Sequence, residues 1–377
     1  MAPPLARLEV LHFRHPLARP IPSVMGPLRN RPALLLRIED AEGAFGWGEI
    51  WCNFPPDGDL HRARLAANVL GGALAGMDAD TTDPFDRMRA RLHRLALQSG
   101  EPGPVSQVAA GADIALHDLR ARRAGKPLGA MLGGTVGPVP AYASGISPAS
   151  WEAQIERMRS LGYRRFKLRV GFGADDSLDV AERVAGSLAP DETLMLDANQ
   201  AWDLATALGY LARLERVAPF WLEEPLAVDA AAEGWATLGR ATGIPLAGGE
   251  NMASREEFDA ANQSGALRFL QPDVCKWGGV SGVLGVARAA EAADITYCPH
   301  FLGGGIGLLA SAHLLSAVGG GGLLEVDSSE NPLLAMFSGG LALEDGVFTL
   351  PPGPGLGPEP DVHAAADLLV RRVELLL

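Results

Sequence analysis

Three carboxylates at matched spacing are the residues best suited to chemistry in this sequence. Asp197, Glu223 and Glu250 each follow a short apolar run and precede residues typical of loops. They are separated by 26 and 27 positions, about the length of one strand plus one helix. Such a spacing places equivalent residues on successive strand ends of a β/α barrel, where active sites of that fold are built. Three like charges converging there require a cation, and oxygen-only ligands favour Mg²⁺ before Mn²⁺.

Further polar residues follow the neighbouring apolar runs. Lys167 and Arg169 are two positions apart, so both side chains lie on one face of a strand, which we expect to be the barrel interior. Asp273 and His300 follow two later runs, and a carboxylate beside an imidazole orients the ring and raises its basicity. Glu325 follows the last run. Because a barrel core is normally filled with branched apolar residues, polar residues at so many strand ends indicate an active site.

Taken singly, these residues have ordinary structural explanations. Asp197 or Glu223 alone is as readily a helix cap or a surface carboxylate, and a lone histidine such as His300 is more often structural than catalytic. All three carboxylates at this spacing, with an aspartate one β/α unit before the histidine, favour a site. Glu224 is interpreted as structural, because adjacent side chains of a strand point to opposite faces.

The elements that must position these residues repeat with a regular period. From Val139 to Val326, eight short apolar runs alternate with helical stretches and recur every 24 to 28 residues. This pattern predicts an α/β fold in which a β/α barrel carries the site. A doubly wound open sheet is the alternative, but that fold usually has a Gly-rich first turn and lacks eight such evenly spaced units.

The residues before the barrel predict a smaller unit of strands and helices. Residues 5–50 are rich in strand formers and contain a polar turn at 39–43 that ends in glycine, as a hairpin turn often does. Residues 59–98 are rich in Ala, Leu and Arg, and residues 106–125 place apolar side chains on one face, so both predict helices. The segment from residue 345 onward is rich in Pro and Gly, and we expect it to pack back on the N-terminal part.

Composition excludes several classes of protein. The chain has 377 residues, of which 47% are hydrophobic, so a barrel and a second domain can each bury a core. The net charge of −13 disfavours a nucleic-acid partner. No stretch is long and apolar enough to span a membrane, and the first residues contain no apolar signal core. Three cysteines do not make a disulfide framework, so we expect a cytoplasmic protein.

Together these motifs resemble the enolase superfamily, and within it the mandelate racemase and muconate lactonizing enzyme-like proteins of the acid-sugar dehydratase group. Residues 196–199, 222–225 and 249–251 resemble the three metal-ligand motifs of that group. Residues 271–273 and 299–300 resemble its Asp–His dyad. The resemblance is specific for the superfamily and much less specific for the substrate.

The resemblance extends over nearly the whole chain. Residues 47–49 resemble the first hairpin of the family's capping domain, and residues 109–134 resemble the segment that closes it. The fold implied is a modified TIM barrel of the (β/α)7β type with an N-terminal α+β capping domain. The expected boundaries are a cap at 1–135, completed by 345–377, and a barrel at 136–344. The family also implies a homo-oligomer with an even number of subunits.

For the site, the resemblance implies Mg²⁺-dependent removal of the proton next to the carboxylate of a small-molecule acid. Asp197, Glu223 and Glu250 are the metal ligands in this interpretation. His300, oriented by Asp273, takes the proton at C2 and protonates a leaving 3-hydroxyl. The reaction converts a sugar acid into a 2-keto-3-deoxy acid.

Further residues complete the implied site from the barrel and from the cap. Loops around residues 18–28 and 51–58 are expected to close over the substrate and to select it. Aromatic side chains there also suit an acid less polar than a six-carbon sugar acid. The residues concerned are Glu325, expected to hydrogen-bond the enediolate, Asn199 and Asn251, expected near the substrate or the metal, and the capping-loop residues Trp51 and Phe54.

Two departures from the family pattern bear on the reaction. Many members carry Lys-x-Lys on the second strand, whereas this chain has Lys167-Leu168-Arg169. Arginine stays protonated at working pH, so Arg169 is expected to neutralise the substrate rather than to act as a base. Lys167 is expected to share that role, unless crowding by cations lowers its pKa. Asp273 replaces the lysine typical of the cycloisomerase-like and dipeptide epimerase branches, which argues against those activities.

Two alternatives to a dehydratase stay open. A racemase or epimerase of a 2-hydroxy or amino acid needs proton-transfer groups on both faces of the substrate, and Arg169 is a poor second group. A metal-binding but catalytically silent paralogue is the other alternative, and the intact Asp273–His300 pair speaks against it.

Overall fold

The N-terminal part of the protein is built on a four-stranded antiparallel sheet. The computed structural model describes residues 2–171, 177–340 and 343–377. The strand order is β14-β1-β2-β3, so a strand from the end of the chain lies beside the first strand. The predicted hairpin turn forms because Asp40 accepts two backbone N–H groups and Gly43 takes a positive φ of 86°. The bounds are β1 (Leu5–Ile21), β2 (Leu28–Asp40), β3 (Phe45–Ile50) and β14 (Leu369–Leu376).

Helices pack against this sheet, and the third of them is its main partner. Helix α3 begins four residues before the predicted start, since Pro102 suits a first helical turn, and it is buried along most of its length. It approaches β3 so closely that glycine is required at the contact: a Cβ at Gly48 would lie 2.0 Å from the carbonyl oxygen of Gly111. The bounds are α1 (Gly58–Leu74), α2 (Pro84–Ser99), α3 (Pro102–Arg123) and α4 (Leu128–Met131).

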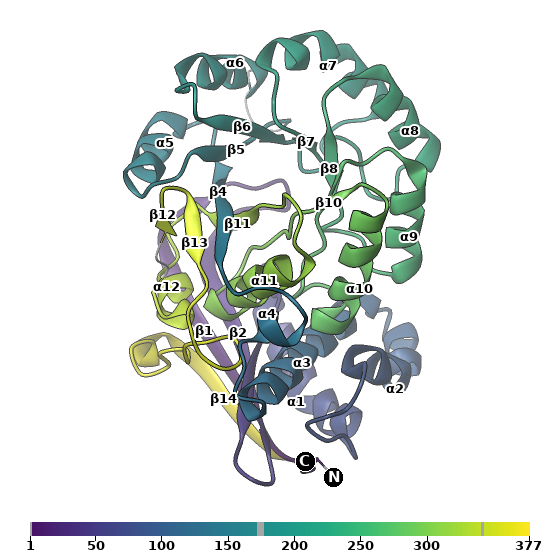
Figure 1. Cartoon of the computed structure of the whole chain (residues 1–377), viewed down its shortest axis with the longest axis vertical. Coiled ribbons are helices and arrows are strands. Elements are labelled where there is room, and N and C mark those ends of the chain that lie inside the picture. Colours follow the sequence, from purple (N-terminus) through teal and green to yellow (C-terminus); the bar gives the residue numbers. More distant parts are fainter. Residues whose placement is uncertain (1, 172–176, 341–342) are drawn as a thin grey trace.

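Eight parallel strands form the predicted barrel, in the order β11-β4-β5-β6-β7-β8-β9-β10, with helices between them on the outside (Figure 1). The strands are β4 (Pro138–Ile146), β5 (Arg165–Arg169), β6 (Thr193–Asp197), β7 (Leu222–Glu223), β8 (Leu246–Gly248), β9 (Phe269–Leu270), β10 (Thr296–Tyr297) and β11 (Leu324–Asp327). The helices are α5 (Trp151–Ser160), α6 (Ser177–Ser187), α7 (Leu204–Val217), α8 (Ala232–Ala241), α9 (Arg255–Ser264), α10 (Gly279–Ala292), α11 (Gly305–Val318) and α12 (Pro332–Ser338).

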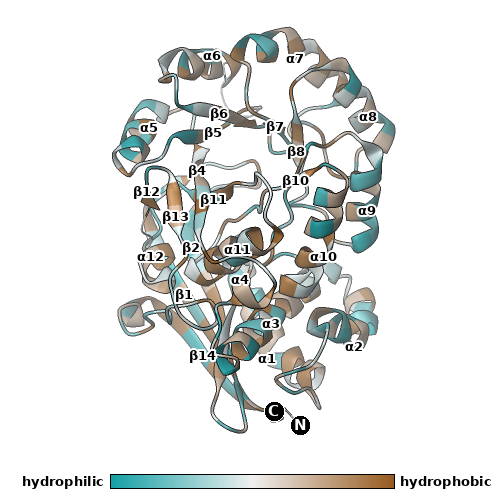
Figure 2. Cartoon of the chain, viewed as in Figure 1, coloured by the Kyte–Doolittle hydropathy of each residue, from teal (hydrophilic) through white to brown (hydrophobic). Residues whose placement is uncertain are grey.

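The barrel departs from full regularity at its last strand. Among the described residues, β10 and β11 do not pair with each other, so hydrogen bonds do not close the ring of barrel strands. The last barrel strand is followed by the short, seven-residue helix α12 and then by the C-terminal segment. These features agree with the modified barrel expected from the sequence. On the outside, hydrophilic residues lie along the exposed sides of α8 and α9 (Figure 2).

A small apolar cluster fills the inside of the barrel below the strand ends. Its buried members are Tyr142, Met195, Trp221, Ala247, Cys298 and Leu323. Most of them stand two positions before a polar residue at a strand end, for example Met195 before Asp197 and Trp221 before Glu223. Because side chains two apart on a strand share a face, the apolar cluster forms the floor on which the polar residues rest.

The C-terminal segment contacts both parts of the molecule. Its first strands, β12 (Leu343–Glu344) and β13 (Val347–Thr349), form a hairpin that pairs with β4 of the barrel. A 3₁₀ turn (Ala366–Leu368) then leads into β14, which pairs with β1 in the cap. In the described part of the chain, no helix combines the length and apolar character needed to cross a membrane. All three cysteines are buried and unbonded.

Candidate active site

The carboxyl ends of the barrel strands and two segments of the cap line a pocket of about 160 Å³. Most of the predicted site residues meet there, although they come from strands spread over the whole barrel. Glu223 and Asp273 do not line the pocket and lie buried behind it, with 1% and 2% of their surfaces exposed. The predicted residues that line the pocket are Lys167, Arg169, Asp197, Asn199, Glu250, Asn251, His300, Glu325, Trp51 and Phe54.

His300 and Asp273 form the predicted hydrogen-bonded pair. His300 Nδ1 lies 2.8 Å from Asp273 Oδ2, and the other oxygen of Asp273 accepts two backbone N–H groups of its own loop, which fixes the carboxylate. His300 Nε2 contacts Glu250. Burial alone would lower the pKa of His300, but Glu250 and Glu325 outweigh it, and the pKa is raised well above its usual range. The pair is therefore arranged to hold a proton on Nδ1 and to present Nε2 to the pocket.

Lys167 lies on β5, on the other side of the ring of strands from His300, and carboxylates surround its ammonium group. Its Nζ contacts Glu223 and lies 2.8 Å from Glu325 Oε1 and 3.9 Å from Asp197 Oδ2. Burial alone would lower the pKa of Lys167, but Glu223 and Glu325 outweigh it and raise the pKa well above its usual range. Three carboxylates therefore surround the ammonium group of Lys167 and stabilise its charged form.

Glu223 is held at the bottom of the site by neutral donors as well as by Lys167. Its Oε2 accepts the indole N–H of Trp221 at 3.0 Å and the amide of Gln271 at 2.7 Å. Burial raises the pKa of Glu223 to about 8, although Lys167 acts against the shift. Asp197 faces Glu223 across the β6–β7 ladder, so the two carboxylates stand at the same level of the barrel.

Glu250 and Asn251 follow β8 and connect several charged groups. Asn251 Nδ2 donates to Glu250 Oε1 at 2.9 Å and to both oxygens of Glu224 at 3.0 Å. Lys276 Nζ donates to Asn251 Oδ1 at 2.7 Å and lies 3.9 Å from Glu250. Burial alone would raise the pKa of Glu250, but His300 and then Lys276 outweigh it and lower the pKa. The amide of Asn251 thus fixes the relative positions of two carboxylates.

The interpretation of Glu224 as a structural residue is wrong, because this side chain lines the pocket. Strand β7 ends at Glu223, and Glu224 takes a φ of 39°, which breaks the alternation of faces on which that interpretation rests. Burial raises the pKa of Glu224 well above its usual range, and Glu250 and Asp197 add to the shift. A fourth carboxylate therefore belongs to the acidic end of the pocket.

The acidic end of the pocket fits a hard divalent cation by its donor chemistry. Asp197, Glu224 and Glu250 offer only carboxylate oxygens and repel one another: burial raises the pKa of Asp197, and Glu250 adds to that rise. In the described part of the chain, no group of three or more Asp, Glu, His or Cys side chains is arranged so that it could already hold a metal ion. A cation bound between the carboxylates would offset their repulsion, and carboxylate oxygens are the ligands that Mg²⁺ prefers.

The cap contributes an apolar wall and contacts to two cations of the pocket. Arg169 at the end of β5 donates to the carbonyl oxygen of Pro22 at 3.4 Å. The ring of Trp51 lies 5.1 Å from Lys276 Nζ, a distance at which an aromatic face attracts an ammonium group. Both predicted capping segments thus reach the pocket. Their lining residues are Ser23, Met25 and Leu28 from the first segment and Trp51 and Phe54 from the second.

Two further charged groups line the pocket besides Glu224. Lys276 lines the pocket three residues after Asp273. Asp327 also lines it and is paired with Arg31 of β2, a contact between barrel and cap. Asp327 is signalled by its position, since it stands two residues after Glu325 and so shares its face. No local pattern in the sequence indicates where the Lys276 side chain points.

Comparisons with known proteins match both parts of the chain. The model "Mandelate racemase / muconate lactonizing enzyme, N-terminal domain" matches residues 6–133, and "Enolase C-terminal domain-like" matches residues 150–365. A D-galactarolactone cycloisomerase from Agrobacterium fabrum is 30% identical over 367 residues, covering 92% of this chain and 94% of the relative. A D-galactonate dehydratase from Klebsiella pneumoniae is 31% identical over 293 residues, 74% of each chain.

Solved structures extend the comparison. A mandelate racemase/muconate lactonizing enzyme from Bordetella bronchiseptica RB50 is 46% identical, with a TM-score of 0.89 over 98% of this chain and all of that one. A racemase from Streptomyces coelicolor A3(2), solved with bound magnesium, is 28% identical, with a TM-score of 0.85 over 97% of this chain and all of that one.

A capped β/α barrel with an acidic cluster and a histidine–aspartate pair at its strand ends defines an enolase-type barrel protein. The chain belongs to the mandelate racemase/muconate lactonizing enzyme family of the enolase superfamily, in the acid-sugar dehydratase group. The fold class and the family expected from the sequence are confirmed.

Proposed function

We propose that this protein is a Mg²⁺-dependent lyase that removes water from a sugar acid and yields a 2-keto-3-deoxy acid. The observation that carries the proposal is the His300–Asp273 pair, whose imidazole faces a pocket that also contains cationic and acidic groups. Cations suit the carboxylate of the substrate, and the acidic end suits a metal ion. The dehydratase among the relatives acts on such an acid, D-galactonate.

Asp197, Glu223 and Glu250 are the proposed ligands of Mg²⁺. Their spacing along successive strand ends supports this set, as does the pairing of Asp197 with Glu223 across adjacent strands. Asn199 steadies Asp197 with its backbone and side-chain N–H groups, both at 2.8 Å. When bound, the metal supplies Lewis acidity, which stabilises negative charge on the substrate carboxylate as the neighbouring proton leaves.

His300 is the proposed base and acid. Asp273 holds the Nδ1 proton, so Nε2 takes the C2 proton of the substrate, and the C2–H electrons enter the enediolate. These electrons then form the C2–C3 double bond while the C3–O bond breaks. Nε2 returns its proton to the departing hydroxyl, which leaves as water. The remaining enol takes up a solvent proton at C3, releases the proton of its C2 hydroxyl to solvent, and becomes the 2-keto acid.

Lys167 and Arg169 are the proposed electrostatic partners of the substrate. Lys167 is locked as a cation by its carboxylates, so it neutralises charge and moves no proton. Glu325 accepts hydrogen bonds from Ser144 and from the backbone of Phe301 at 3.0 Å, so its oxygens are already used as acceptors. We therefore assign Glu325 the task of holding Lys167 and reserve contact with the enediolate for the lysine.

Ring opening of a cyclic sugar acid is the second candidate, favoured by the cycloisomerase among the relatives. A ring oxygen on the carbon β to the free carboxylate can leave in place of a hydroxyl. The same proton abstraction by His300 then opens the ring, and no water is released. Asp273 in place of a lysine therefore does not exclude every cycloisomerase.

A screen of sugar acids with the Mg²⁺-loaded enzyme tests the proposal. The panel contains linear aldonates and aldarates together with their lactones and anhydro forms, and products are detected as 2-keto acids by semicarbazide absorbance. Mass spectrometry then separates the candidates, because dehydration lowers the mass by 18 Da and ring opening leaves it unchanged. We expect a linear acid to lose water and to incorporate one deuterium from D₂O.

Three results of the screen would count against dehydration. Turnover restricted to cyclic acids, without mass change, would establish the second candidate. Interconversion of two epimers without a keto product would establish racemisation, the activity named for one solved relative. Absence of α-proton exchange on every acid, in protein that binds Mg²⁺, would indicate the silent paralogue.

A further inference from the structure

Glu49, near the end of the cap strand β3, is buried and bonded to the barrel. It is 2% exposed, and its carboxylate accepts the backbone N–H groups of Gly304 and Gly307, the latter at 2.8 Å. These residues are the N-cap and the third residue of α11, a helix without a capping side chain of its own. A carboxylate at this place satisfies free N–H groups and interacts favourably with the helix dipole. Glu49 therefore determines where α11 begins, shortly after His300.

The loop 300–304, which carries the histidine into α11, is anchored at four consecutive backbone groups. The first three hydrogen bonds measure 3.0, 2.6 and 2.8 Å, and the fourth is the contact of Gly304 N–H with the cap carboxylate. Two of the four anchors therefore come from the cap and two from the barrel. In chain order along the loop, the anchoring side chains are Glu325, Asn53, Asn331 and Glu49.

Glycine in this loop allows the cap to approach. A Cβ at Gly303 or at Gly304 would lie 2.9 Å from Glu49 Oε1, a distance that real Cβ atoms do not adopt. Any larger residue at either position would push the carboxylate away from the helix start. The loop sequence is thus suited to receive an acidic side chain from the cap.

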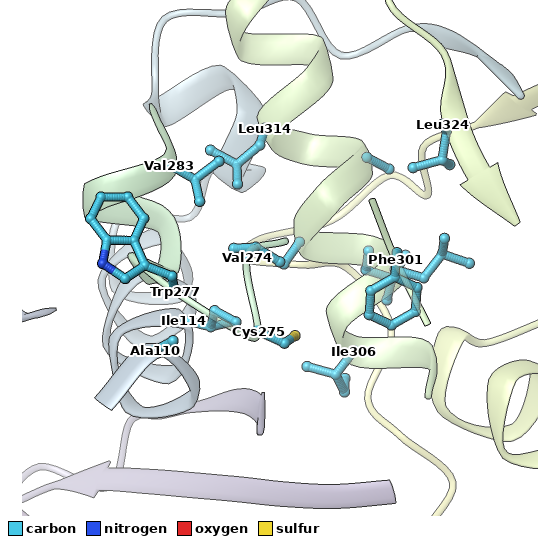
Figure 3. Packing of buried hydrophobic residues seen from close by; sticks show 14 of the residues in the cluster. Ala110, Ile114, Val274, Cys275, Trp277, Val283, Phe301, Ile306, Leu314 and Leu324 are labelled. Atoms are coloured by element: carbon cyan, nitrogen blue, oxygen red, sulfur yellow. The ribbon is translucent and has the colours of Figure 1, made fainter. Parts of the chain in front are cut away.

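The same cap segment also touches the loop that carries Asp273. The backbone N–H of Trp51 donates to the carbonyl oxygen of Cys275 at 3.5 Å, two residues beyond the aspartate. Figure 3 shows Cys275 in one apolar cluster with Ile114 of α3 and Ile306 of α11. Residues 49–53 therefore contact the loops that carry both members of the proposed catalytic pair, with an apolar layer behind them.

We propose that Glu49 and Asn53 are positioning residues of the cap, which hold the His300 loop in register with Asp273. This inference rests on the proposed function, because it concerns the base of that reaction. Neither residue lines the pocket, so neither contacts the substrate. Both act through the backbone of the loop, and they couple the geometry of the base to the docking of the cap on the barrel.

The proposal requires that loss of either contact displaces the imidazole and leaves the substrate contacts in place. A base must stand within hydrogen-bond reach of the proton it removes, and a displacement near 1 Å costs on the order of 10²-fold in rate. Loss of either contact should therefore lower kcat. The KM, which depends on Lys167, Arg169 and the metal in the proposed site, should change little.

The test compares Asn53→Ala and Glu49→Gln with Asp118→Asn as a matched control. Asp118 is another buried carboxylate of the cap, and it accepts the backbone N–H groups of Trp47 at 2.8 Å and Leu356 at 2.6 Å without touching the loop. For each variant we measure kcat and KM on a substrate from the screen and Tm. We also record the ¹⁵N chemical shifts of the His300 ring, assigned with His300→Asn.

We expect Asn53→Ala to lower kcat tenfold or more with KM within twofold, and to move the His300 ring signals. Glu49→Gln should act in the same direction, and if it fails to fold, Asn53→Ala decides. Asp118→Asn should keep kcat within twofold at a temperature well below its Tm. The ¹⁵N signals report on the position of the His300 ring even if the enzyme turns over none of the acids. A wrong proposed function can therefore be distinguished from a wrong inference about Glu49 and Asn53.

The inference is overturned if Asn53→Ala leaves both kcat and the His300 ring signals as in the wild type. It is also overturned if Asp118→Asn lowers kcat as strongly as the loop variants, since general loosening of the cap would then explain the loss.

Discussion

The two sides of the pocket present charged groups in opposite ways. On one side, His300 donates a hydrogen bond from Nδ1 to Asp273, and its Nε2 contacts Glu250 at the acidic end of the pocket. On the other side, Lys167 is enclosed by Glu223 and Glu325, and Arg169 reaches the cap backbone. An imidazole can take and return a proton, whereas a guanidinium keeps its protons at working pH.

In the proposed function, this difference would give the pocket a direction for proton transfer. A racemase must deliver a proton to either face of a planar enediolate, so it needs a titrating group on each side. An elimination needs such a group on one side only, with fixed positive charge on the other. The unequal sides therefore favour elimination over racemisation, and variants that alter one side test the comparison.

Removal of His300 should have the largest effect. We expect His300→Asn to lower turnover by about 10²–10⁴-fold, because general acid–base catalysis contributes about that much. Exchange of the α-proton into D₂O, followed by NMR, should disappear with turnover. Mg²⁺ binding by calorimetry serves as the control and should survive. Exchange at the wild-type rate in this variant would place the base elsewhere.

A comparison of Glu223 and Glu224 tests which of these adjacent glutamates is the third metal ligand. We expect Glu223→Gln to weaken Mg²⁺ binding by about 10²-fold in calorimetry, because the spacing favours Glu223 as a ligand. Glu224→Gln should weaken it less, since Asn251 already holds both oxygens of that side chain. The reverse order would move the third ligand from Glu223 to Glu224.

Substitution of Arg169 should sharpen the contrast between the two sides. Arg169→Met should lower kcat/KM about 10- to 100-fold, which corresponds to about 1.5–3 kcal/mol for a lost hydrogen bond to a charged group. Arg169→Lys restores the Lys-x-Lys pair of many relatives and should allow slow exchange of the opposite enantiomer. NMR of both enantiomers in D₂O measures this. Rapid interconversion by the wild type would show that both sides already relay protons.

The smallest expected effect concerns His313, another buried histidine, and the stability of the protein. Burial lowers the pKa of His313 to about 4, and its Nδ1 accepts the N–H of Gly129 at 3.1 Å, which a protonated ring could not do. Between pH 6.5 and 4 the unfolded chain binds more protons than the folded protein, so stability is complete above pH 6.5 and falls as the pH falls. At pH 5.5 the loss is about 1 kcal/mol by linkage.

Denaturant unfolding at pH 7.5 and 5.5 measures this contribution. His313→Gln, whose amide oxygen can accept the same N–H, should reduce the difference in the free energy of unfolding between the two pH values by about 1 kcal/mol. The exposed His363→Gln is the control and should leave that difference unchanged. Equal pH dependence in all three proteins would remove His313 as the cause.

The strand ends could be predicted from sequence because two periodicities coincide there. The β/α repeat predicts where each strand ends, and the alternation of faces predicts which residues point inward, which is how Lys167, Asp197 and Glu325 are found. Glu224 escapes the same rule because its positive φ ends the alternation one residue after the strand. The family resemblance suggests roles for the site residues but does not indicate which of them contact one another. The carboxylates around Lys167 are therefore seen only in the structure.

The anchors of the His300 loop lie outside any local pattern. Asn53 and Leu302 are 249 positions apart, and Glu49 and Gly304 are 255 apart. Short polar residues in a cap hairpin are ordinary in sequence, and nothing near them indicates a partner so far along the chain. Only the docking of the cap on the barrel brings them together.

The pairing of β14 with β1 has a consequence for the order in which the protein is made. Arg7 in the first strand and Glu374 in the last are 367 positions apart, yet they form one ladder and an ion pair. On the ribosome, the barrel strands emerge while β1 still presents an unpaired edge, which is a site for pairing with other chains. The sheet can be completed only after the last strand leaves the exit tunnel. Synthesis of residues 369–376, rather than synthesis of the N-terminal strands, therefore sets the earliest moment at which that edge is covered.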